Sequence, residues 1–234
     1  SGLLEKFDGL NLWTSHPINA GDNLSSNHLV AFNFNIYNRD FIVPYDSLDE
    51  NDEPVDHVFS DQGLPKPEKG SEGTVSLEYK YTNRRPFRMN NWLPKKGWGL
   101  KTKLDLADAN AYGDFTYQRL TFDSFTNVES GFGILFLRGK SMVLWGDPPA
   151  QEYLGLTKDQ PFYLPGSAGT GGFPENMSPR GWSGYQQGDR LIFGTMEYRI
   201  SLIEKLPINI LGITLGDVTG AVISDIGNAW YNGN

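Results

Sequence analysis

The chain has 234 residues, no cysteine and a net charge of −8 at neutral pH. The length allows one large all-β domain, and the acidic balance argues against a nucleic-acid partner, because no basic stripe exists to displace counterions from phosphates. Absence of cysteine excludes disulfides and thiolate metal sites, and is compatible with an oxidising bacterial envelope. Aromatic residues make up 13% of the chain, beside 27 glycines and 14 prolines, a mixture typical of many strands and few helices.

No apolar run reaches the roughly 18 to 20 residues of a transmembrane helix. A transmembrane β-barrel stays open, because its strands alternate and give a far weaker hydropathy signal. Ser1 and Gly2 are not followed by a basic and then an apolar stretch, so we expect no signal peptide and interpret the chain as a mature or trimmed piece.

Apolar and polar residues alternate along the first half, which predicts strands at 7–14, 28–37, 74–81 and 100–106. The second and third of these carry an apolar face made of Val30, Phe32, Phe34, Ile36, Val75, Leu77 and Tyr79. The opposite charged face would meet water in a soluble sandwich and would line the lumen of a barrel, and periodicity alone does not separate the two.

The segment 46–70 is acidic and contains proline. Closely spaced oxygen ligands suit Ca²⁺, but the spacing matches no defined loop, and charge runs are usually solvated. We therefore expect a loop outside the membrane.

Further strands are predicted at 111–122, with a bulge between Tyr117 and Leu120, and at 130–145. The connection that follows, at about 146–188, is too long to be idle linkage. Its glycines lack the Lys-Ser/Thr pair and helix start of a phosphate-binding loop. The three histidines are scattered and no serine lies in a Gly-x-Ser-x-Gly elbow, so we expect no enzyme, no metal and no cofactor. A carboxylate pair for glycoside hydrolysis stays open, although nothing selects two of the acids.

Four motifs follow in order in the last third of the chain. Gly171-Gly172 precedes Arg180-Gly181-Trp182, then Gly194-x-x-Glu197-Tyr198-Arg199, then Asp225-x-Gly227-x-x-Trp230. In order and spacing this set resembles the C-terminal barrel of the outer-membrane assembly and translocation superfamily. That superfamily includes BamA, TamA, the two-partner secretion transporters and the chloroplast import channel, and its barrel is called the bacterial surface antigen domain. Upstream, only the strand rhythm agrees.

The resemblance implies that residues 1–234 are part of an antiparallel transmembrane β-barrel in the bacterial outer membrane. About eight strands of a sixteen-stranded barrel would be present, with the loop at 146–188 folded into the lumen and the closing strands absent. The runs 189–202 and 213–225 would be the twelfth and thirteenth strands.

The resemblance also implies a site. Arg180, in a loop motif with Gly181 and Trp182, would reach the lumen and bind Glu197 and Asp225, while Gly227 and Trp230 belong to a strand motif. Pro179 stands where the family has an aliphatic residue. In the run 189–202 the pattern itself places Glu197 opposite Ile192, Met196, Tyr198 and Ile200, a face suited to lipid.

The function implied is insertion of outer-membrane proteins or translocation of polypeptides. Outer-membrane lipid, polypeptide clients and other envelope assembly proteins would be the partners. Two alternatives stay open: a passive barrel that anchors a separate soluble domain or forms a pore, and a soluble β-sandwich that binds glycans through its tryptophans.

Overall fold

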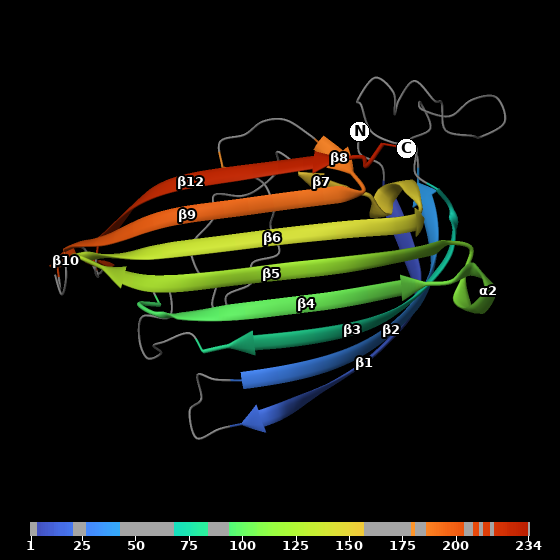
Figure 1. Ribbon diagram of the computed structural model, residues 1–234, viewed down its shortest axis with the longest axis horizontal. Coiled ribbons are helices and arrows are strands. Elements are labelled where there is room, and N and C mark those ends of the chain that lie inside the picture. The colour runs from blue at the N-terminus through green and yellow to red at the C-terminus, as the bar shows by residue number, and fades with distance from the viewer. Residues whose placement is uncertain are drawn as a thin grey trace.

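The computed structural model describes residues 4–20, 27–42, 68–83, 94–156, 179–180, 186–203, 208–210, 213–215 and 218–233. One antiparallel sheet of eight strands dominates it, in the order β1-β2-β3-β4-β5-β6-β9-β12 (Figure 1). Each of these strands pairs with the preceding long strand of the chain. The predicted all-β antiparallel class is therefore confirmed.

The long strands are β1 (Leu4–Ala20), β2 (Asn27–Ile42), β3 (Gly70–Thr82), β4 (Gly97–Ala107), β5 (Thr116–Ser130), β6 (Gly133–Asp147), β9 (Arg190–Ile203) and β12 (Val218–Trp230). The short elements are the helix α2 (Ala109–Tyr112), the 3-10 turn η2 (Ala150–Glu152), and the strands β7 (Leu154–Leu156), β8 (Gln186–Gly188), β10 (Ile208–Ile210) and β11 (Ile213–Leu215). β7 pairs with β8 and β10 with β11. The described residues thus do not form the two facing sheets of a sandwich.

The strand predicted at 111–122 was wrong in two details. Residues 109–112 form α2 rather than the start of a strand, because the Asp108 carboxylate caps the turn by accepting a bond of 2.9 Å from the Asn110 amide. The register of β5 against β4 and β6 runs without a shift through Tyr117 and Leu120, so the predicted bulge is absent. Alternation slips there because Tyr117 faces an apolar cluster on the inner side while Leu120 faces outward.

Three segments in the second half of the chain also differ from the prediction. β6 begins at Gly133 rather than at residue 130, after a turn in which Gly131 has a φ of 60°. The long connection is not structureless, since it contains η2, β7 and β8. The run 213–225 is not one strand, because Ile213 pairs with Ile210 in a separate hairpin and β12 extends from Val218 to Trp230. Gly216 and Asp217 stand between the two pieces, a turn signal that the prediction of one continuous strand did not use.

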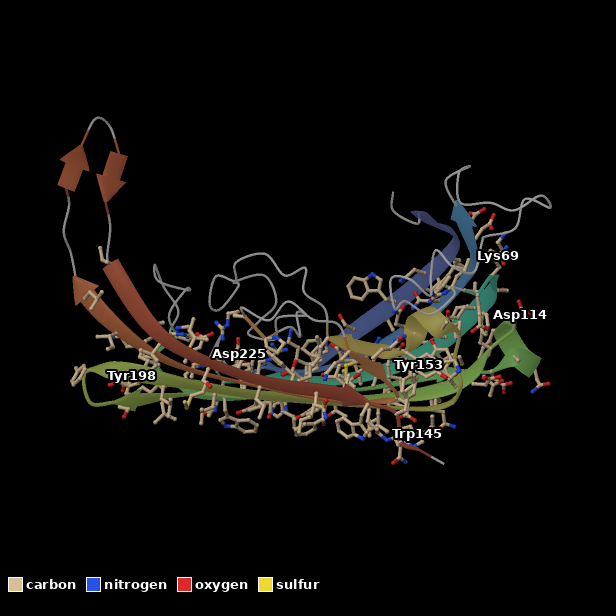
Figure 2. All side chains as sticks on the ribbon, turned by 90° about the horizontal axis from the view of Figure 1, so that it is seen from above. Lys69, Asp114, Trp145, Tyr153, Tyr198 and Asp225 are labelled. Carbon is tan, nitrogen blue, oxygen red and sulfur yellow. The ribbon has the colours of Figure 1, made fainter. Side chains whose placement is uncertain are left out.

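The large sheet is curved, and its two faces have opposite chemistry. Figure 2 shows Asp225 on the concave side and Trp145 on the convex side. Buried polar and charged side chains include Glu72, Ser76, Asp105, Asp123, Arg138, Glu197 and Arg199. Exposed apolar side chains include Leu77, Leu106, Leu120, Phe122, Leu137, Ile192 and Met196. The arrangement is the inverse of a soluble domain, in which apolar residues fill the interior.

The apolar face predicted from β2, β3 and β9 lies on the convex side. None of its members is buried, and Phe32, Leu77, Ile192 and Met196 are exposed by 45 to 54%. They are thus not packed in a protein core, and contact with lipid stays a prediction. Among the described residues, no helix is both long enough and apolar enough to cross a membrane.

The described start of the connection between β6 and β9 packs on the concave side. Leu154 and Leu156 of β7 join inward-facing residues of five strands, namely Ala107, Tyr117, Leu144, Leu191, Phe193 and Ala229, in one buried apolar cluster. This cluster seats the start of the connection close to the site described next.

Candidate functional site

Arg180 reaches across the concave face to two strands. Its Nη1 donates to Glu197 Oε1 at 2.7 Å, its Nε to Asp225 Oδ2 at 2.7 Å and its Nη2 to Asp225 Oδ1 at 2.6 Å. The Arg180 backbone amide also donates to Asp225 Oδ2, at 2.8 Å. The predicted contact with both acids is therefore present. The planar guanidinium binds the Asp225 carboxylate through two nitrogens, a geometry that lysine cannot provide.

The pairing of β9 with β12 brings the acids together. Asp225 lies opposite Thr195, and Glu197 opposite Ile223, so alternation points Thr195, Glu197 and Asp225 to the same side. Arg180 Nη2 donates to Thr195 Oγ1 at 2.5 Å, and the Thr195 hydroxyl donates to Asp225. Three positions on two strands thus form a socket for one cation.

Glu197 is shared between two arginines. Its side chain is fully buried, and its second oxygen accepts from Arg199 Nε at 2.8 Å. The Arg199 guanidinium lies 4.5 Å from the centre of the Phe136 ring, within cation–π range. Burial alone would lower the pKa of Arg180, but its bonds with Asp225 and Glu197 raise that pKa above its ordinary value. Arg180 therefore stays charged, and two acids face two cations in the buried site.

Gly227 makes room for the residue before Arg180. A Cβ at this position would lie 3.0 Å from Leu156 Cδ1 and 3.4 Å from Pro179 Cγ. The Pro179 ring thus packs over the bare backbone of β12, in the place of the aliphatic residue of the resembled motif. Gly227 acts here by close packing, since a side chain would push Pro179 and Leu156 away from the strand.

The other predicted residues are not part of the socket. Trp230 ends β12 on the convex side with 41% of its surface exposed, and its backbone lies against Gly188. Gly181 and Trp182 fall outside the described residues, as does all of the predicted acidic loop 46–70 except its last three residues.

Sequence reasoning missed a second ionic cluster on the concave face. It joins Arg39 of β2, Glu72 of β3, Asp105 of β4 and Arg119 of β5 to Glu152 of η2. Arg39 lies beyond the predicted end of its strand, and Glu152 lies in a connection predicted to be loop. The available signal was the pair of charges Asp105 and Arg119 at inward positions of adjacent strands, which face each other in the register.

A third pair is fully enclosed by the sheet. Arg138 donates to Asp123 through Nε at 3.0 Å and through Nη2 at 2.6 Å, and both side chains are buried. No group of three or more histidine or acidic side chains is placed to hold a metal in the described ranges. Ion pairs between the charged side chains of this face join the strands to one another and to the long connection.

Comparison with protein-family models gives no match, and comparison with curated proteins gives none either.

Proposed function

We propose that this chain is part of a transmembrane β-barrel of the BamA/TamA-like superfamily in the bacterial outer membrane, where it inserts outer-membrane proteins or translocates polypeptides. The observation that carries the proposal is the seating of Arg180, from the long connection, between Glu197 and Asp225 on two neighbouring strands. Each of these three residues belongs to a different one of the four motifs that carry the resemblance, and the contact between them supports the proposal.

The two faces of the sheet give independent support for a membrane setting. Lipid satisfies an apolar convex surface, whereas the charges on the concave side need water or ion partners. The main strands have 11 to 17 residues, enough for the roughly 9 to 11 residues that a tilted strand needs to cross a bilayer. An exposed apolar surface of this extent in a water-soluble protein would promote aggregation.

Closure of the sheet is also part of the proposal. β1 and β12 are the two edges of the described sheet, and an open edge in lipid leaves backbone groups without hydrogen bonds. We propose that further strands complete a barrel of sixteen. The concave face then becomes the lumen wall, with the connection folded inside.

Replacing Arg180 by alanine in the cells that make the protein tests the function. The amount of folded outer-membrane proteins, or the export of a polypeptide client, is expected to fall while the variant itself stays in the membrane. Lys96→Ala is the matched control, because Lys96 forms an ion pair with Glu129 in which both side chains are more than half exposed. Depletion of the whole protein without any change in assembly or export would reject the proposal and favour the passive anchor or pore.

A further inference from the structure

The connection that carries Arg180 begins at the second ionic cluster. Glu152, the last residue of η2, accepts from Arg119 Nη1 at 2.7 Å. Its other oxygen accepts from Arg39 Nη2, across a separation of 113 residues in the chain. The Arg39, Arg119 and Glu152 side chains are 3%, 21% and 15% exposed, so the contact is largely shielded from solvent.

Strand acids hold the two arginines in position for Glu152. Arg119 Nε donates to Asp105 Oδ2 at 2.9 Å, and Arg39 Nη2 lies 2.7 Å from Glu72 Oε2. Arg119 meets Asp105 and Glu152 through different nitrogens, whereas Nη2 of Arg39 faces Glu72 and Glu152 together. Each guanidinium is thereby oriented by an acid of the sheet. Such a preset fork loses little freedom when it binds a carboxylate.

The backbone around η2 is held as well. The Ala150 amide donates to Glu68 Oε1 at 3.0 Å, and the Gln187 side chain donates to the Ala150 carbonyl at 3.1 Å. Leu154 and Leu156 then enter the buried apolar cluster. These contacts fix the start of the connection without using Arg180.

We infer that Glu152 is a second anchor of the connection, with the charge pattern of the Arg180 socket reversed. At one end an acid lies between cations of β2 and β5, and at the other a cation lies between acids of β9 and β12. Figure 2 shows Tyr153, directly after η2, and Asp225 at separate places along the concave side. The connection therefore braces the sheet from β2 to β12, and loss of one anchor frees only that end.

Amide hydrogen exchange of the full chain in lipid vesicles tests the anchor. Glu152→Gln should speed exchange at the Ala150 amide, which donates to Glu68, by about tenfold or more, since a charged hydrogen bond is lost nearby. The Arg180 amide, which donates to Asp225, should stay slow. Arg180→Ala should have the reverse pattern. Glu129→Gln, at a largely exposed ion pair, is the matched control and should change neither amide.

Arg119→Gln removes the same ion pair from the side of the sheet. It should speed exchange at the same amide, and the double variant with Glu152→Gln should change exchange by less than the sum of the two single changes, because the two side chains share one interaction. Unchanged exchange at Ala150 in Glu152→Gln, or simultaneous opening of both ends, would overturn the inference. Only the importance of the anchor for assembly or translocation rests on the proposed function. If the exchange pattern holds while Arg180→Ala leaves assembly and export intact, the anchor stands and the proposed function fails.

Discussion

Arg180 is the residue with the largest expected effect. Its replacement by alanine leaves Glu197 and Asp225 close together on adjacent strands, with Glu197 fully buried and Asp225 3% exposed. Breaking a buried pair from one side costs about 3 to 5 kcal/mol, and less where water enters. We expect the strands still to form but the unfolding temperature in detergent to be lower. The shift in gel mobility on heating measures that temperature. Lysine should restore only part of the loss, because a point charge cannot make the two-bond contact with Asp225. The exposed pair of Lys96 should contribute no more than about 1 kcal/mol.

Gly227 allows a sharper test at the residue scale. The Cβ of valine at this position would lie 3.0 Å from Leu156 Cδ1, which is closer than ordinary packing, and 3.4 Å from Pro179 Cγ. Overpacking of this kind typically costs about 1 to 3 kcal/mol. Gly139→Val is the matched control, since a Cβ there has nothing within 4 Å. We expect Gly227→Val, but not Gly139→Val, to raise protease cleavage of the connection between β6 and β9. Equal cleavage of the two variants would mean that Pro179 does not depend on this gap.

At the scale of the element, each long strand of the proposed barrel has one face toward lipid and one toward the wet lumen. Met196 lies mid-strand on the convex face of β9 with 49% of its surface exposed, and Val128 lies near the end of β5 with 47% exposed. In lipid, arginine at the midplane costs about 2 to 4 kcal/mol and near the interface about 0 to 1 kcal/mol. Met196→Arg should therefore destabilise the folded protein in vesicles much more than Val128→Arg. Equal and small effects would indicate that the convex face meets water.

At the scale of the whole molecule, we expect the acidic segment 46–70 to lie outside the membrane and the strands of the sheet to lie within it. Its charges and prolines would be costly in hydrocarbon, so protease added to intact cells or vesicles is expected to cut within 46–70 and leave the strands intact. The segment joins the ends of β2 and β3 at which α2 and the long connection also emerge. Full protection of 46–70 from both sides would contradict its placement outside the membrane and return Ca²⁺ binding to consideration.

Much of the sheet followed from the sequence alone, because side chains of a strand alternate between its faces whatever the partner strand is. The inward direction of Thr195, Glu197 and Arg199 and the outward direction of Ile192 and Met196 were readable from a few neighbouring residues. The contact of Arg180 with Glu197 and Asp225 followed from the resemblance of the motifs, since no local pattern joins a loop residue to two strands.

The tertiary structure decided what local alternation does not contain. It placed Glu152 beside Arg39, 113 residues away, and it turned Tyr117 toward the apolar cluster under β7, against the polar trend of the concave face. It also divided the segment predicted as one strand at 213–225 between a hairpin and β12. In each case the deciding contact is made by a segment distant in the chain, and its energy depends on which face of the folded sheet is covered.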